Sequence, residues 1–121
     1  MSAAILLIAH GSRRPAANQD LVQLAVMLRP KVPGKIVEVA YLELAEPTIP
    51  EGLEKCRQSG AREIDMLPWF LSAGSHVTDD LSRFRDQFAS EHPGLTVTLR
   101  PPVGLHPLMT DILLARLGER L

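Results

Sequence analysis

The feature that most constrains this chain is an apolar run near its start, AAILLIA from Ala3 to Ala9. The run is too short for a core helix, whereas a continuous apolar segment of this length is typical of a strand in a parallel sheet that is covered on both faces. Such a strand needs a layer of helices on each side. The run therefore predicts an α/β protein.

Strand and helix patterns alternate along the rest of the sequence. We expect strands over 3–9, 35–42, 63–70 and 95–100, and helices over 16–29, between Pro47 and Gly60, from Val77 to Phe88, and over 108–117. Strands joined through helices are parallel. We predict a single domain over residues 1–121: a three-layer, doubly wound sheet of four parallel strands in the order 2-1-3-4, with helices on both faces.

The composition excludes several classes of partner. Thirteen Lys and Arg residues against fourteen Asp and Glu residues give a net charge of -1, so we expect no nucleic acid and no membrane as partner. The apolar run is far shorter than the roughly 20 residues of a membrane span, and it lacks the basic start of a signal peptide. The only cysteine, Cys56, cannot form an internal disulfide. We expect an inert, packed thiol and a cytoplasmic location.

Three chemically capable side chains follow the ends of the predicted strands. His10 follows the first strand, Glu43 follows the second, and the loop from Leu71 to His76 follows the third. Ligands of doubly wound sheets bind outside the carboxyl ends of the strands, where the winding reverses. Topology alone therefore predicts one crevice that holds His10, Glu43 and His76, three groups that can bind metal or move protons.

The common nucleotide-binding and hydrolytic motifs are missing from the sequence. It contains no G-x-G-x-x-G, no P-loop, no G-x-S-x-G and no H-E-x-x-H. The His-Gly pair at His10 is preceded by Ala9, where a histidine phosphatase needs arginine. These classes of enzyme are therefore disfavoured.

Four sequence patches carry a family resemblance: L-I-A-H-G-S-R around His10, Y-L-E-L-A-E-P around Glu43, L-P-W-F-L-S-A-G-S-H-V-T-D-D-L around His76, and P-P-V-G-L-H-P before the last helix. Together they resemble the sirohydrochlorin chelatases of the CbiX and SirB kind, which are class II tetrapyrrole metal chelatases. The resemblance extends from Leu7 to Pro107. Its most specific part is P-x-F-L-x-x-G-x-H-x-x-x-D, here Pro68 to Asp80.

The resemblance implies a chelatase-like fold and a metal-inserting enzyme. His10 and His76 would bind the metal and act in catalysis, and Glu43 would be a third ligand or the proton acceptor. The substrates would be a divalent ion, Co²⁺, Fe²⁺ or Ni²⁺, and sirohydrochlorin, with no organic cofactor. Two imidazoles suit this task because they leave coordination positions open for release of the ion. Two departures are Ser82, where many members have proline, and a length that fits one lobe where larger members have two.

Further residues have both a functional and a structural interpretation. Ser12, Arg13 and Arg14 are candidates to bind the peripheral carboxylates of the substrate, although loop arginines are often merely solvated. Ser75 is a fourth candidate for substrate contact. Asp80 either orients the ring of His76 or complements the helix dipole. For His106 we expect a structural role at the entry of the last helix.

Two broader alternatives remain from the sequence. The same histidines would serve a non-catalytic carrier of metal or tetrapyrrole, and a flavodoxin-like regulatory module would leave the crevice empty.

We also expect a homodimer, because a tetrapyrrole is a broad plate and one lobe offers an open crevice. The last helix supports this expectation, since its apolar residues cover more than the stripe of about 100° that packing on one sheet requires. The alternative is that this helix is wedged within its own lobe. The apolar residues are Leu108, Met109, Ile112, Leu113, Leu114 and Leu117.

Overall fold

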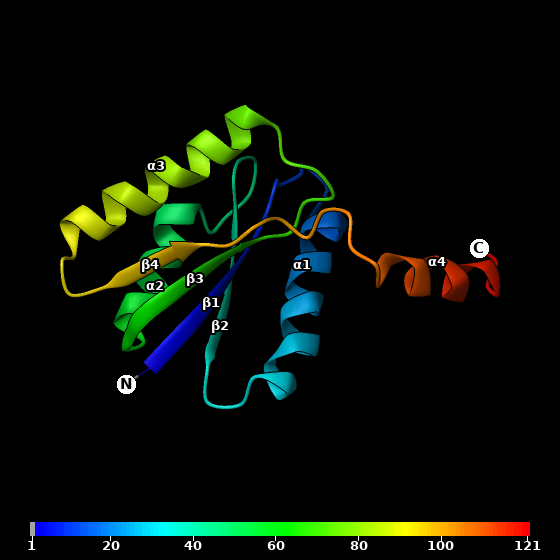
Figure 1. Ribbon diagram of the computed structural model, residues 1–121, viewed down its shortest axis with the longest axis horizontal. Helices are drawn as coiled ribbons and strands as arrows, with labels where there is room; N and C mark the ends of the chain where they lie inside the picture. The colour runs from blue at the N-terminus through cyan, green and yellow to red at the C-terminus, as the bar shows by residue number, and fades with distance from the viewer. Residues whose placement is uncertain (1) are drawn as a thin grey trace.

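Strands and helices alternate along the chain as the apolar patterns predict (Figure 1). The computed structural model describes residues 2–121. The strands are β1 (Ser2–Ala9), β2 (Ile36–Tyr41), β3 (Ala61–Pro68) and β4 (Thr96–Leu99). The helices are α1 (Pro15–Leu28), α2 (Ile49–Gln58), α3 (Ser75–Glu91) and α4 (Met109–Leu117), with a 3-10 turn, η1, over Arg29–Lys31.

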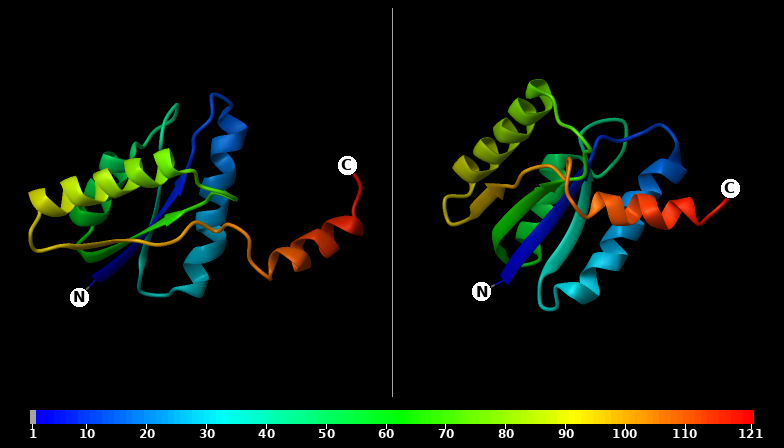
Figure 2. Two further views of the ribbon diagram at one scale, coloured as in Figure 1. Left: turned by 45° about the horizontal axis from the view of Figure 1, so that its top comes forward. Right: turned by 45° about the vertical axis from the view of Figure 1, so that its right-hand side comes forward.

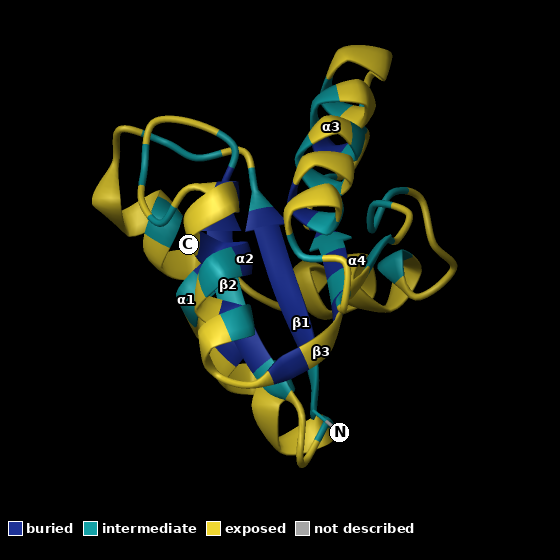
Figure 3. Ribbon diagram, turned by 90° about the vertical axis from the view of Figure 1, so that its left-hand side faces the viewer, coloured by how far each residue is buried: buried dark blue, intermediate teal, exposed yellow. Residues whose placement is uncertain are grey.

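The four strands form one parallel sheet in the order β2-β1-β3-β4, which confirms the predicted topology. β1 lies in the middle and pairs with β2 on one side and β3 on the other, and its central residues are buried (Figure 3). Pro68 ends β3, as expected for a residue that cannot donate a hydrogen bond to a neighbouring strand. β3 begins two residues earlier than predicted, at Ala61 rather than Glu63.

Helices cover both faces of the sheet, so the predicted three-layer arrangement is confirmed (Figures 1 and 2). α1 packs on one face through Leu21 and Ala25, against Ile5 and Leu7 of β1. α2 and α3 pack on the opposite face, where Leu53 and Leu81 join a larger core. The sheet together with α1, α2 and α3 is called the lobe below.

Local sequence signals explain where the helices begin. α1 has Pro15 in its first turn, where a missing N–H costs nothing. At α2, the Thr48 hydroxyl accepts a hydrogen bond from the Glu51 N–H, and the Glu51 carboxylate accepts one from the Thr48 N–H. This capping box begins the helix that the prolines of the sequence predicted.

Cys56 of α2 is fully buried, which confirms the inert thiol. Burial raises the pKa of this thiol to about 12. None of the helices in residues 2–121 combines the length and the hydrophobicity needed to cross a bilayer.

α4 stands apart from the lobe and covers neither face of the sheet (Figures 1 and 2). It has no buried residue. The hypothesis that this helix is wedged within its own lobe is therefore wrong. Its entry is fixed at His106, whose Nδ1 accepts a hydrogen bond of 3.1 Å from the Leu108 N–H, as the structural role predicted for this histidine requires.

Candidate metal centre at the carboxyl edge of the sheet

His10 and Glu43 face each other because β1 and β2 continue to pair beyond their last strand residues. The Leu42 N–H donates to the Ala9 carbonyl at 2.9 Å, and the Glu43 N–H donates to the His10 carbonyl at 3.0 Å. The register pairs Ala9 with Tyr41, so Glu43 lies one residue beyond the position level with His10. These backbone bonds hold the two loops side by side where the strands end, and there the two side chains meet.

Gly11 allows the close approach of the two loops. Its φ is +100°, and a Cβ at this position would lie 1.7 Å from the Glu43 carbonyl oxygen. Only glycine combines this backbone conformation with the absence of a side chain. The His-Gly pair of the sequence is therefore required by the geometry of the edge.

The imidazole of His10 lies beside the carboxylate of Glu43. The His10 Nε2 and Glu43 Oε1 atoms are 3.3 Å apart, and the two side chains are 55% and 51% exposed. The ring of Phe70 meets the His10 ring edge-on at a centroid distance of 6.2 Å. An imidazole and a carboxylate that are both open to solvent can bind a first-row metal ion or accept a proton from a bound ligand.

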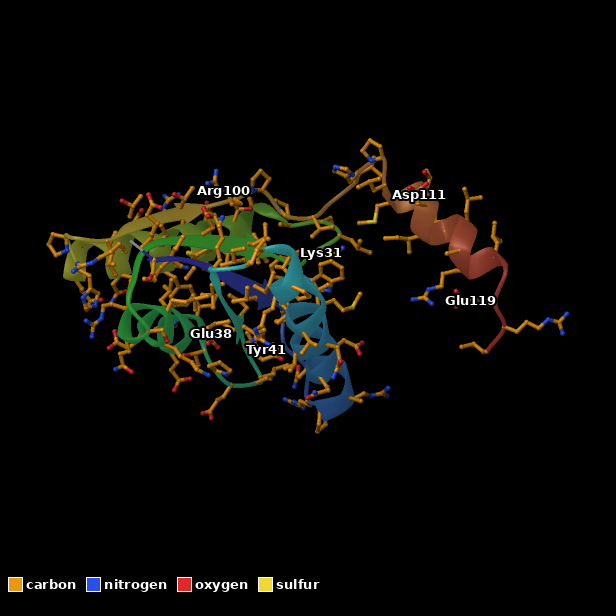
Figure 4. The ribbon with its side chains drawn as sticks, turned by 90° about the horizontal axis from the view of Figure 1, so that it is seen from below. Lys31, Glu38, Tyr41, Arg100, Asp111 and Glu119 are labelled. Atoms are coloured by element: carbon orange, nitrogen blue, oxygen red, sulfur yellow. The ribbon has the colours of Figure 1, made fainter. Side chains whose placement is uncertain are left out.

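The loop between His10 and α1 is held by Asn18, a residue that the sequence analysis did not identify. The Ser12 N–H donates to Asn18 Oδ1 at 2.9 Å, and Asn18 Nδ2 donates to the Ser12 carbonyl at 2.8 Å. The Tyr41 hydroxyl donates to the Asn18 carbonyl at 2.5 Å, and Tyr41 lies beside α1 (Figure 4). Burial raises the pKa of Tyr41. No short motif marks these contacts, because they join residues six and 23 positions apart.

Ser12, Arg13 and Arg14, the three residues of this loop that were predicted to contact the substrate, differ in their surroundings. The Ser12 hydroxyl accepts a hydrogen bond of 3.0 Å from the Arg14 N–H, so it also shapes the turn. The side chains of Arg13 and Arg14 are exposed, and within residues 2–121 neither forms an ion pair. Both guanidinium groups are therefore free to meet an anionic ligand near His10.

His76 and Ser75 lie in the first turn of α3, which follows the loop after β3, and both are exposed. The structure places His76 at the same edge of the sheet as His10. It does not join the two histidines with Glu43, since no group of three or more His, Cys, Asp or Glu residues in the described chain is close enough to hold a metal ion. Asp80 pairs with Arg83 in α3.

A hollow of about 440 Å³ opens beside Glu43, between the β2–α2 loop and α3. The lining residues are Leu42, Glu43, Asp80, Arg83, Phe84 and Gln87. Only Glu43 and Asp80 of this set were singled out from the sequence. Phe84 lies within the helix predicted from Val77 to Phe88, but the sequence could not show that this helix faces Glu43.

Fold and site together define a class of protein: a doubly wound α/β protein with a paired histidine and carboxylate where its parallel strands end. A family model described as CbiX matches residues 4–120. The chain belongs to the CbiX family.

Comparisons with single proteins agree with this membership. The sirohydrochlorin ferrochelatase of Arabidopsis thaliana chloroplasts is 35% identical over 89% of this chain and 48% of its own length. The sirohydrochlorin cobaltochelatase of Methanosarcina barkeri is 32% identical over 97% of this chain and 95% of its own length. The crystal structure of the sirohydrochlorin chelatase SirB from Bacillus subtilis subspecies spizizenii, in complex with cobalt, superposes with a TM-score of 0.88 at 30% identity, over 98% of this chain and 50% of that chain. This chain thus spans about half the length of the Arabidopsis and Bacillus proteins.

Proposed function

We propose that this protein is a chelatase that inserts a divalent metal ion into sirohydrochlorin. The observation that carries the proposal is the contact of 3.3 Å between His10 Nε2 and Glu43 Oε1 at the carboxyl edge of the sheet. The membership in the CbiX family supports it, as do relatives named as sirohydrochlorin ferrochelatase and cobaltochelatase.

Metal insertion requires that two pyrrole N–H protons leave as the ion binds the four ring nitrogens. The charge balances, because one divalent cation replaces two protons. A neutral imidazole at His10 binds the incoming ion through a ring nitrogen, and the Glu43 carboxylate adds an oxygen ligand or accepts a released proton. A site with few protein ligands keeps coordination positions open, so the ion can pass to the ring.

We assign the remaining roles in the same reaction to the predicted residues. His76 is proposed as the second histidine of the centre, presented by the first turn of α3. Ser12, Arg13, Arg14 and Ser75 are proposed to bind the peripheral carboxylates of the tetrapyrrole. The metal is a substrate here, and Co²⁺, Fe²⁺ and Ni²⁺ all accept these ligand types.

The proposed location is the cytoplasm, supported by a single cysteine that is buried. The proposed assembly is a homodimer, because one copy spans about half of the Bacillus chelatase, and a second copy would supply the missing half. Light scattering on the active protein tests the assembly. A particle of twice the mass of one chain is expected, and a fully active monomer would overturn it.

The test of the activity mixes the purified protein with sirohydrochlorin and one metal at a time, and follows the absorbance of the tetrapyrrole. Repeated turnover with at least one of the three metals is expected. A spectral change that stops at one equivalent of protein would overturn the enzyme and identify a carrier. No spectral change with any metal would reject both functions.

A further inference from the structure

An apolar hollow lies at the carboxyl edge of the sheet. Trp69, Phe70, Leu71 and Val103 line a space of about 200 Å³. Trp69 and Leu71 are the exposed members of this set, with exposed fractions of 45% and 76%. None of the four side chains carries a charge. Apolar surface that is left open to water at a functional edge is typical of a site that binds an apolar part of a ligand.

Backbone hydrogen bonds on both sides hold the segment that carries Trp69. The Trp69 N–H donates to the Ile8 carbonyl at 2.6 Å, which continues the pairing of β3 with β1. The Val103 N–H donates to the Pro68 carbonyl at 3.2 Å, so the segment after β4 runs alongside the segment after β3 (Figure 1). The hollow is therefore formed before a ligand binds, which lowers the entropic cost of binding.

Phe70 joins the hollow to the candidate metal centre. Its side chain lines the hollow, and its ring meets the His10 ring edge-on at a centroid distance of 6.2 Å. A ligand in the hollow thus lies next to an aromatic ring that contacts His10. The loop after His10 adds the exposed guanidinium groups of Arg13 and Arg14. This edge therefore combines an apolar surface, an imidazole that can bind metal and two positive charges.

The ligand that matches this combination is the tetrapyrrole of the proposed function. Its macrocycle is flat and apolar on its faces, its periphery carries carboxylates, and its centre has to reach the metal ligand. The carboxylates are complementary in charge to Arg13 and Arg14. A pocket that encloses a drug-sized ligand has a volume of about 300–1,000 Å³. The hollow is smaller, so it takes one pyrrole ring and leaves the rest of the macrocycle over the edge that carries His10.

We propose that Trp69 is a substrate-binding residue, whose indole supports one pyrrole ring of the tetrapyrrole while Leu71 and Val103 pack around that ring. Offset stacking of two aromatic rings stabilises a complex beyond the apolar area that it buries. In the pattern P-x-F-L of the sequence, Trp69 occupies the position that accepts any residue, so this contact is a property of the present chain. The inference rests on the proposed function, because it assigns a further contact of the same substrate.

Trp69 is the only tryptophan, so a single indole N–H resonance reports on this position. Metal-free sirohydrochlorin is titrated into the isotope-labelled full chain without added metal, so that binding is observed without turnover. We expect a large upfield shift of the indole resonance, because the ring current of the macrocycle acts on nuclei that lie over its face. The amide of Gly94, in the loop between α3 and β4 at the opposite edge of the sheet, is the control and should not move. Binding that leaves the indole resonance unchanged would overturn the proposal.

Variants separate contact with the substrate from support of the fold. Trp69→Ala should raise the KM for sirohydrochlorin by about tenfold with little change in kcat, because the contact exists in the ground state and in the transition state alike. Trp69→Phe should restore most of the affinity, since it keeps an aromatic face. Val26→Ala, on α1, is the matched control with the KM of the wild-type protein, because Val26 is 50% exposed and Trp69 is 45% exposed. An unchanged KM in Trp69→Ala would overturn the proposal.

The contact at Trp69 and the proposed function fail in different ways. The Kd for metal-free sirohydrochlorin is measured for each variant from the absorbance of the tetrapyrrole, independently of metal insertion. An indole shift on binding, together with a Kd that rises in Trp69→Ala, supports the contact, and if no metal is inserted only the proposed function is rejected. Metal insertion with the same Kd and KM in Trp69→Ala as in the wild-type protein rejects the contact and keeps the proposed function.

Discussion

Gly11 and Glu43 approach so closely that a Cβ on Gly11 would lie 1.7 Å from the Glu43 carbonyl oxygen. The loop that carries His10 and the loop that carries Glu43 are therefore in direct backbone contact. Any side chain at Gly11 has to push the two loops apart. The distance between the side chains of His10 and Glu43 thus depends on Gly11, although Gly11 has no side chain that could take part in the chemistry.

Gly11→Ala should disrupt the site more than the fold. The φ of +100° at Gly11 costs an alanine about 1–3 kcal/mol, and the clash additionally displaces Glu43. Gly34→Ala is the control, because Gly34 has a φ of +84° with nothing within 4 Å of its Cβ position. Urea unfolding should show a loss of stability in both variants, and metal insertion should fall only in Gly11→Ala. Equal activity of the two variants would contradict the close contact.

His10→Ala should lower the rate of metal insertion by about 100-fold or more, the scale expected for loss of a general base or ligand. Glu43→Gln should lower it less, because the amide keeps the shape and one oxygen. Glu46→Gln, an exposed carboxylate of the same loop, serves as the control. The turnover rate and the melting temperature are measured together. Full activity of Glu43→Gln would make this carboxylate a surface charge.

His76→Ala should reduce metal insertion as strongly as His10→Ala does, while the melting temperature changes little, because His76 is exposed in the first turn of α3. His92→Ala is the comparison, since His92 follows the other end of α3 and packs against Phe88. If His76→Ala keeps near-normal turnover, the metal centre contains His10 without His76.

Asn18→Ala should loosen the loop that follows His10. The substitution removes two hydrogen bonds to Ser12 and should cost about 1–2 kcal/mol of unfolding free energy. Amide hydrogen exchange at Ser12 should accelerate, and metal insertion should decrease. Gln23→Ala, an exposed position of the same helix, should change none of these quantities. Unchanged exchange at Ser12 would show that Asn18 does not hold the loop.

The buried thiol of Cys56 predicts a loss of stability in alkali. Its pKa is raised by burial to about 12 in the folded protein, from 9.0 in an unperturbed chain. Between these values the unfolded chain loses the thiol proton and the folded chain keeps it. The free energy of unfolding should therefore fall as pH rises from about 9 towards 12, by up to about 1.4 kcal/mol per pH unit from this group.

Cys56→Ala isolates this contribution, because the variant keeps every other titrating group, including Tyr41. Urea unfolding at pH 8 and at about pH 10.5 compares the two proteins. The wild-type protein should lose more stability than the variant between these pH values. The same loss in both proteins would assign the alkaline effect to other groups.

The local spacing of apolar residues along the sequence determined most of the fold. The apolar run Ala3–Ala9 could only be a covered central strand, and the alternation that follows it left a parallel sheet of order β2-β1-β3-β4 as the expected topology. The same topology predicted one crevice for His10, Glu43 and His76, because parallel strands end at a common edge, and the structure brings His10 and Glu43 into contact without His76. The sheet order could be predicted because it rests on the spacing of apolar residues along the chain, which backbone geometry converts into position.

Contacts between distant segments decided the rest. Asn18 holds Ser12 and accepts from Tyr41, and Gly11 admits the backbone of Glu43, yet no spacing in the sequence marks these partners. The sequence showed that α4 is apolar on more than one side, and only the tertiary structure showed that the helix leaves its lobe. The physical reason is that the apolar pattern gives the amount of surface that a helix has to bury, whereas the path of the chain before α4 depends on bonds between distant residues, such as that from the Gly104 N–H to the Phe70 carbonyl.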